Sequence, residues 1–188
     1  MTNIQELIQR INKNPEVFSE IIQEYEGKLM RYILQMSSME YEEAENLLQN
    51  VFIKVYQNIN EYQEQWSFSS WIYRITHNAI IDHFRANKSE NGNISLDDEE
   101  YAYIVAALTD GLSPDQELLR SDARECVKKS IATLPQDYRE AIILRYFEDR
   151  SYQEMSDILK IPIGTASTLV NRAKKRLLES LEKLHCIS

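Results

Sequence analysis

Apolar residues recur every three or four positions along most of this chain, a spacing that places them on one face of an α-helix. One series runs from Phe18 to Met36, and a second runs from Ala44 to Ile59. Only four glycines and four prolines occur among 188 residues, which leaves little material for β-hairpin turns. The pattern therefore predicts an all-α fold.

The helical pattern lapses between residues 86 and 113, where the chain is polar and acidic and shows no sustained period. A loop of this length is usually functional or disordered, and we interpret it as a linker with a short helical patch over 101–108. We therefore expect two small helical domains, residues 1–86 and residues 114–188, joined by an acidic linker over residues 87–113.

The formal net charge of −9 would by itself disfavour a nucleic-acid partner, but the charge is unevenly distributed along the chain. Residues 86–118 carry 1 Lys+Arg against 8 Asp+Glu, whereas residues 119–188 carry 13 against 10. Acid is therefore concentrated in the middle of the chain and the C-terminal part is basic, so binding of nucleic acid by that part is compatible with the composition.

No apolar run approaches the ~20 residues of a membrane span, and the first residues lack the order of a signal peptide, so we expect a cytoplasmic protein. Cys126 and Cys186 match no metal spacing, and Cys126 is better interpreted as a small buried hydrophobe than as a redox group. His77 and His83 lie about 240° apart around a helix and cannot share an ion. With no phosphate loop or nucleophile motif, we expect no metal, no cofactor and no enzymatic activity.

Residues 151–178 follow the pattern of a helix-turn-helix. Ser151 and Glu154 fit a capping box, "IPIG" at 161–164 interrupts the helical period, and a longer amphipathic helix follows. Two helices are expected before this motif. The first runs from Pro114 to about Thr133, and the second has Pro135 in its first turn, so that the four helices form one unit. The exposed face of the last helix offers Thr165, Ser167, Thr168, Asn171, Arg172, Lys175 and Arg176. These side chains suit base edges and phosphates, although an ordinary helical hairpin with a solvated face remains the alternative.

The stretch "WSFSSWIYRITHNAIIDHFR" from Trp66 to Arg85 holds both tryptophans, and Ser67 or Ser69 can cap its helix. Its sides are apolar nearly all round, so we expect a largely buried helix with one narrow polar strip that includes Asn78, Asp82 and Arg85. Asp82 and Arg85 admit two interpretations, a buried structural ion pair or support for DNA. Most of the aromatic side chains are expected in the core, although unpaired bases also stack on aromatic faces.

Together these motifs resemble a bacterial sigma factor of the extracytoplasmic-function (ECF) group, within the sigma-seventy family of RNA polymerase. "EEAENLLQNVFIKVYQNINEY" is similar to the segment that grips the polymerase core, and "FSSWIYRITHNAIIDHFR" to the segment that recognises and opens the minus-ten element. "LPQDYREAIILRYFEDRSYQEMSDILKIPIGT" is similar to the segment that leads into the helix-turn-helix for the minus-thirty-five element. The resemblance implies a transcription initiation factor with polymerase core and promoter DNA as partners, and often an anti-sigma factor.

The resemblance also implies site residues. Core-binding positions are Glu45, Leu48, Gln49, Asn50, Phe52, Ile53 and Lys54. Minus-ten positions are Phe68, Trp71, Arg74, Asn78, Asp82 and Arg85, and minus-thirty-five positions are the exposed residues of the last helix named above. The family usually has carboxylates where Asn46 and Asn50 stand and basic residues near Ser167 and Leu169, so its core and upstream contacts are altered here.

Two other functions are compatible with the sequence. A stand-alone helix-turn-helix regulator would bind its operator tightly as a free protein, in the usual form as a dimer on a palindromic site. An adaptor without DNA recognition would bind the polymerase core but select no promoter. A sigma factor would bind DNA weakly alone and gain specificity only with core.

Overall fold

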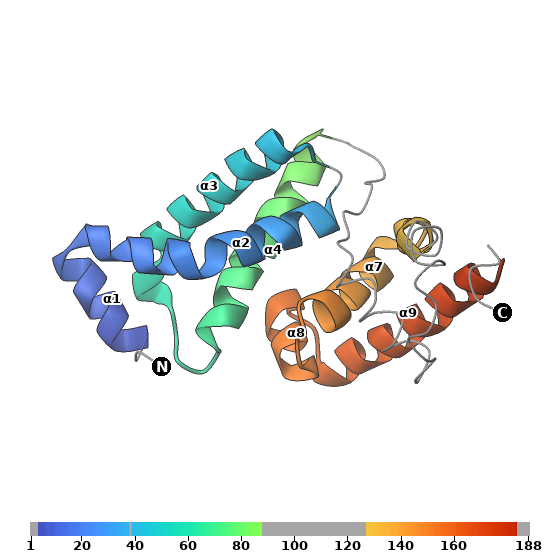
Figure 1. The fold of residues 1–188 in the computed structure, drawn as a ribbon. Coiled ribbons are helices and arrows are strands. Elements are labelled where there is room, and N and C mark those ends of the chain that lie inside the picture. Colours follow the sequence, from blue (N-terminus) through green and yellow to red (C-terminus); the bar gives the residue numbers. More distant parts are fainter. Residues whose placement is uncertain (1–3, 38, 88–126, 184–188) are drawn as a thin grey trace, which may run out of the picture. The chain divides into compact units, whose positions relative to one another are not determined.

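A computed structural model describes residues 4–37, 39–87 and 127–183, and within these ranges the chain forms helices and no β-strand (Figure 1). This confirms the all-α prediction. The chain divides into two compact units, one mostly before residue 90 and the other mostly after it. Each unit is described by itself below.

The first unit contains the two predicted amphipathic helices, the helix of the tryptophan-rich stretch and one helix that periodicity did not single out. Its elements are α1 (Ile4–Lys13), η1 (Pro15–Phe18), α2 (Ser19–Met36), α3 (Tyr41–Gln57), η2 (Ile59–Glu61) and α4 (Phe68–Asn87). The unpredicted α1 buries Leu7, Ile8 and Ile11. Its polar side is fixed as well, because Asn12 donates to Asn60 Oδ1 at 2.8 Å.

Aromatic and branched side chains from α2, α3 and α4 fill the core of this unit. Tyr32 and Tyr73 are fully buried with their ring centroids 5.2 Å apart. The Tyr32 hydroxyl lies 3.4 Å from Nδ1 of His77, and burial lowers the pKa of His77 to about 4. A fully buried large apolar side chain contributes about 1.5–3 kcal/mol, so this packing holds α4 firmly against its neighbours.

The second unit contains a helical stretch over 127–132, then α7 (Gln136–Ile142), η4 (Ile143–Phe147), α8 (Tyr152–Leu159) and α9 (Ile163–Lys183). Pro135 was predicted in the first turn of its helix, but it lies at the cap position before α7. Its carbonyl accepts from the N–H groups of Tyr138 and Arg139 at 3.0 Å. The segment η4 is a π-helix, with the N–H of Glu148 donating to the carbonyl of Ile143 at 3.0 Å.

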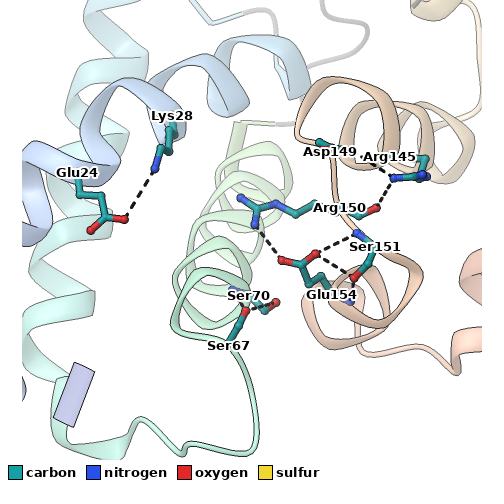
Figure 2. A network of polar contacts seen from close by, with 9 residues as sticks. All are labelled: Glu24, Lys28, Ser67, Ser70, Arg145, Asp149, Arg150, Ser151 and Glu154. Carbon is teal, nitrogen blue, oxygen red and sulfur yellow. Dashed lines mark hydrogen bonds and ion pairs between the residues drawn. The ribbon is translucent and has the colours of Figure 1, made fainter. Parts of the chain in front are cut away.

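The start of α8 is fixed by a network of hydrogen bonds (Figure 2). Ser151 Oγ accepts from the Glu154 N–H at 3.2 Å, and Glu154 Oε2 accepts from the Ser151 N–H at 3.0 Å, which confirms the predicted capping box. Arg150 Nη1 donates to Glu154 Oε1 at 3.2 Å. Burial opposes ionisation of Glu154, but the bonds from Ser151 and Arg150 outweigh it and hold the pKa of that carboxyl below its usual value.

The turn between α8 and α9 depends on Lys160, whose φ of 55° lies in the left-handed region. Ser156 Oγ donates to the carbonyl of Ile161 at 2.6 Å and holds this turn closed. The turn therefore begins before "IPIG", and Gly164, which we expected in the turn, lies inside α9.

Replacing Ser151 by alanine is expected to lower the stability of α8 by about 1 kcal/mol, because the N–H of Glu154 loses its acceptor at the start of the helix. Hydrogen exchange of residues 152–159 in the full chain would measure this loss. Ser180→Ala, inside α9, provides the control. It should not speed the exchange of residues 152–159, since alanine has a higher helix propensity than serine and does not weaken α9. Equal protection of α8 in both variants would contradict a role for the cap.

Three predicted segments lie outside the described residues: the linker from residue 88 onward, its helical patch, and most of the helix after Pro114. The same holds for Leu119, Ala123, Cys126 and Cys186. In the described end of that helix, Val127 and Ile131 are buried at 2% and 0% exposure.

Candidate functional site

The exposed face of α3 combines apolar and polar side chains. Ile53 is 53% exposed and lies opposite the buried side of the helix, which consists of residues such as Val51 and Val55. Glu45 and Gln49 precede Ile53 at intervals of four residues and are also exposed, so the three side chains form one strip. Such an apolar side chain among polar neighbours is the arrangement that a protein interface uses at its centre.

Not all of the predicted core-binding residues reach this surface. Asn50 and Lys54 are exposed beside the strip, whereas Leu48 and Phe52 are buried at 3% and 8% exposure. Tyr56 belongs to the apolar series from Ala44 to Ile59, which was expected to face inward, yet it is 42% exposed although its ring lies against Phe18, with the centroids 5.2 Å apart. The periodicity could not reveal this, because a tyrosine at the edge of an apolar face can pack on one side and meet solvent on the other.

The start of α4 is held by a cluster of aromatic rings. Tyr62, Phe68 and Trp71 lie with centroids 5.4 to 5.7 Å apart, and Tyr25 of α2 joins them at 5.8 Å from Phe68. Ser67 caps the helix, since its Oγ accepts from the Ser70 N–H at 3.0 Å. Phe68 and Trp71 are buried, so the expectation that most of these aromatics belong to the core is confirmed for them and they do not present a ring to solvent.

Polar side chains occupy one side of α4 beyond this cluster. Arg74 is half-buried, and Asn78, Asp82 and Arg85 are exposed, all within an arc of about 80° around the helix. Asp82 Oδ1 and Arg85 Nη1 are 3.7 Å apart with side chains 62% and 76% exposed. The interpretation of this pair as a buried structural ion pair is therefore wrong; as a solvent-exposed pair it adds little stability.

The exposed face of α9 carries most of the residues predicted for it. Thr165, Thr168, Arg172, Lys175 and Arg176 lie within about 100° of one another, opposite the buried side formed by residues such as Ala173 and Leu177.

Two predicted side chains of α9 lie outside this arc. Ser167 is half-buried beside the apolar side, and Asn171 is exposed about 40° beyond the edge of the arc. Within the arc, Thr168 Oγ1 donates to the carbonyl of Gly164 at 2.8 Å, and Arg176 lies 4.0 Å from Glu179. Positive charge on this face is therefore concentrated at Arg172 and Lys175.

Two further properties concern only the part of the chain that the structure describes. No group of three or more His, Cys, Asp or Glu side chains there could hold a metal ion. His83 instead faces Glu43 of α3, with Nε2 and Oε1 3.0 Å apart. No helix there is both long enough and apolar enough to cross a membrane.

Two family models match the chain, one for each unit. The model for sigma-70 region 2 matches residues 21–90, and the model for sigma-70 region 4 matches residues 124–177. The first match contains α3 and α4, and the second contains α7, α8 and most of α9.

Similar proteins and structures extend this likeness over nearly the whole chain. ECF RNA polymerase sigma factor SigW of Bacillus subtilis is 31% identical over 96% of this chain and 98% of that protein. RNA polymerase sigma-H factor of Pseudomonas aeruginosa is 28% identical over 96% of this chain and 94% of that protein.

Two solved structures share the fold. The sigma factor RpoE in complex with the anti-sigma factor NepR, from Bartonella quintana, is similar with a TM-score of 0.61 and 22% identity, covering 88% of this chain and 96% of that one. CnrH in complex with the cytosolic domain of CnrY is similar with a TM-score of 0.65 and 16% identity, covering 94% and 95%. With both region models matched in order and a relative above 30% identity over 98% of that relative's length, the chain belongs to the ECF sigma factors of RNA polymerase.

Proposed function

We propose that this ECF sigma factor, a transcription initiation factor that directs RNA polymerase to promoters, divides its contacts among the exposed faces of α3, α4 and α9. The first domain, residues 1–86, would bind core polymerase and open the minus-ten element. The second, residues 114–188, would bind the minus-thirty-five element. The acidic segment 87–113 would join them and follow a positively charged path through core.

The exposed strip of α3 is the surface proposed for core polymerase. Ile53 is its apolar centre, and the surrounding contacts come from Glu45, Gln49, Asn50, Lys54 and Tyr56. Leu48 and Phe52 act from beneath by holding α3 on the unit's core, because both side chains are buried. An apolar side chain surrounded by polar groups that exclude water is the usual form of an interface hot spot.

The polar side of α4 is the surface proposed for the opened minus-ten element. Asn78 and Arg85 are exposed and can reach bases or phosphates, and the exposed Asp82 can accept a hydrogen bond from a base edge. Arg74 lies at the end of α4 nearest the preceding loop. Phe68 and Trp71 support this surface from within the aromatic cluster. Bases taken from a duplex are bound by stacking and by contacts to their edges, which offset a cost of a few kcal/mol for unpairing.

The exposed face of α9 is the surface proposed for the minus-thirty-five element. The observation that carries this proposal is the arrangement of Thr165, Thr168, Arg172 and Lys175 on one side of the second helix of a capped helix-turn-helix. Hydroxyl groups near the start of such a helix reach base edges, and the basic residues one to two turns later reach phosphates. Arg176, Asn171 and Ser167 would supply flanking contacts.

An anti-sigma factor is proposed as a further partner. Both solved structures described above are complexes with another protein: the sigma factor RpoE with the anti-sigma factor NepR, and CnrH with the cytosolic domain of CnrY. We propose that this chain acts in the cytoplasm with RNA polymerase, without a catalytic step or a cofactor of its own.

Run-off transcription with bacterial core polymerase tests the function, with and without this protein, on genomic fragments that include its own upstream region. We expect discrete transcripts that depend on the protein. Arg172→Ala should weaken promoter binding by the holoenzyme and reduce the slope of log affinity against log salt by about 1, because one phosphate contact is lost.

Lys174→Ala is the matched control, because Lys174 lies on the opposite side of α9 and is half-buried. An equal loss in both variants would contradict the proposed face. If the protein gives no transcripts and forms no complex with core, a stand-alone regulator becomes the better-supported function. A stable complex with core but no transcripts would favour an adaptor.

A further inference from the structure

The last turns of α4 are held differently from the rest of the helix. Ala79 and Ile80 are buried at 4% and 0% exposure. Over residues 81–86, the part of this end whose side chains the structure describes, no side chain is buried. Asp82 and Arg85 of the proposed minus-ten surface both belong to this stretch. Full burial therefore stops at Ile80, and the direction of these two side chains depends on contacts nearer the surface.

A polar pair joins this end of α4 to the start of α3 (Figure 1). His83 Nε2 and Glu43 Oε1 are 3.0 Å apart, with side chains 21% and 48% exposed. Nε2 carries a proton in the imidazolium ion and in one of the two neutral tautomers, so it can donate to the carboxylate in both forms. The Phe84 ring packs against the imidazole, with the centroids 6.3 Å apart. The Glu43–His83 pair thus links two helices at the turn where burial has ended.

The position of His83 around α4 suits it to fix the rotation of the helix about its axis. At 100° per residue, His83 lies about 100° from Asp82 and about 160° from Arg85. The bond to α3 therefore holds the side of the helix that faces away from Arg85. A rotation that breaks this bond also turns Asp82 and Arg85 out of place. Because a partly exposed pair adds little to the stability of a whole unit, we expect its effect to be local.

The other half of the pair belongs to the helix that carries the proposed core-binding strip. Glu43 lies two residues before Glu45, in the first turn of α3. A carboxylate in the first turn is favoured by the helix dipole, but Glu42 provides that as well, so the dipole alone does not account for the contact with His83. The pair therefore connects the helix proposed to bind core polymerase with the surface proposed to bind DNA.

We propose that Glu43 and His83 are positioning residues for minus-ten binding, which hold the last turns of α4 against α3 and so set the direction of Asp82 and Arg85. This inference rests on the proposed function of α4 and adds to it two residues that the sequence motif did not assign. Neither side chain contacts DNA itself. Both act through the exposed side chains of the same turns.

The test separates two binding steps. Titration of labelled full chain with core polymerase gives the first affinity. Holoenzyme formed from core and each variant is then titrated with a single-stranded oligonucleotide, the non-template strand of the minus-ten element of a promoter found by run-off transcription. We expect His83→Ala and Glu43→Ala each to lower the oligonucleotide affinity about fivefold and to change core affinity less than about twofold. No loss, or an equal loss in both steps, would overturn the positioning role.

His83→Gln is the conservative variant that should restore binding. The Nε2 atom of glutamine is as many bonds from Cβ as the Nε2 atom of histidine, so it can donate to Glu43 from a similar place. We expect this variant to keep the oligonucleotide affinity within about twofold of the unchanged protein. Alanine has the higher helix propensity, so weaker binding by His83→Ala would not come from a weaker helix. Equal losses in the two variants would contradict a role for the bond.

Glu40→Ala is the matched control for Glu43→Ala. It removes the same charge at the start of α3, where Glu40 is exposed and its side chain forms no cap hydrogen bond. Both affinities should stay within about twofold of those of the unchanged protein. If Glu40→Ala lost as much oligonucleotide affinity as Glu43→Ala, the loss would come from the charge at this end of α3, and the pair would have no special part.

Arg85→Ala separates this inference from the function on which it rests. Loss of oligonucleotide affinity with Arg85→Ala but not with His83→Ala would overturn the positioning role alone. No loss with either Arg85→Ala or Asp82→Ala would contradict the proposed role of this end of α4, and the inference with it. The double variant of His83 and Arg85 should lose less than the product of the two single losses, because His83 acts in part through Arg85. Losses that multiply in full would show that the two residues act independently.

Discussion

Replacing Ile53 by aspartate is expected to weaken binding to core polymerase roughly 30-fold or more, because truncation of a central apolar contact typically costs about 2 kcal/mol or more. The added carboxylate would also have to be desolvated within the interface. Ile53 is 53% exposed, so the change should leave the fold of the first unit intact. Titration of labelled protein with core measures the dissociation constant, and circular dichroism checks the helices.

Gln9→Asp is the matched control for this variant. It adds the same charge at an exposed residue of α1, a helix outside the proposed contact set. We expect less than a threefold change for this variant, which corresponds to about 0.6 kcal/mol. Equal weakening by both variants would indicate a general effect of charge and would contradict an apolar contact at Ile53.

Replacing Glu140 by glutamine is expected to stabilise the second unit above neutral pH by about 2–3 kcal/mol. Burial raises the pKa of the Glu140 carboxyl to about 7, with the nearby Asp137 acting in the same direction, while the hydrogen bond from Gln136 and the charge of Arg139 oppose the rise. The neutral amide of glutamine avoids the cost of a buried carboxylate.

The sign of the pH dependence follows from proton binding. The ordinary pKa of a glutamate carboxyl is 4.5. Between pH 4.5 and about 7, the folded chain therefore keeps the Glu140 proton that the unfolded chain has lost. The stability that protonation provides is therefore full below pH 4.5 and is lost as the pH rises through 7. Glu140→Gln should abolish this decline.

Hydrogen exchange of residues 136–147, corrected for intrinsic rates, is the appropriate measurement because both tryptophans lie in the first unit and do not report on the second. Glu182→Gln, at an exposed position of α9, is the control and should leave the pH dependence unchanged. If the stability of Glu140→Gln declined with pH by the same amount, the pH dependence would come from another group.

The parts of the fold that were predictable are those in which local chemistry and packing agree. The capping box of Ser151 and Glu154 involves neighbours three residues apart, so the sequence alone defines both partners. The apolar positions of α2, α3 and α9 repeat with the helical period, and nearly all of them are buried. The order of the motifs was enough to indicate the family.

The errors arose where tertiary structure decides the outcome. A buried ion pair was one of the two interpretations of Asp82 and Arg85, since their helix is apolar on most sides, yet both side chains are exposed to solvent. Lys160 takes the left-handed position of the turn that a glycine would adopt at less cost, so Gly164 gave a misleading signal. Neither outcome has a signature in residue spacing.

The candidate site was predictable as a set of faces but not side chain by side chain. Leu48 and Phe52 share the helix with Ile53, and only packing against the rest of the unit determines that the first two are buried and the third is exposed. Trp66 stands in the same aromatic stretch as Trp71, and its exposure depends on the path of the loop before α4.

The π-helical segment η4 has a consequence for how chain length relates to structure in this unit. A π-turn closes between residues five apart and so holds one residue more than an α-turn, as in the bond from Glu148 to Ile143. A relative that lacks one residue in this segment can close the same turn as an ordinary α-helix. Its α8 would then start at the same place, so an alignment gap here marks a local change of helix type and leaves α9, the helix proposed to bind the minus-thirty-five element, in register.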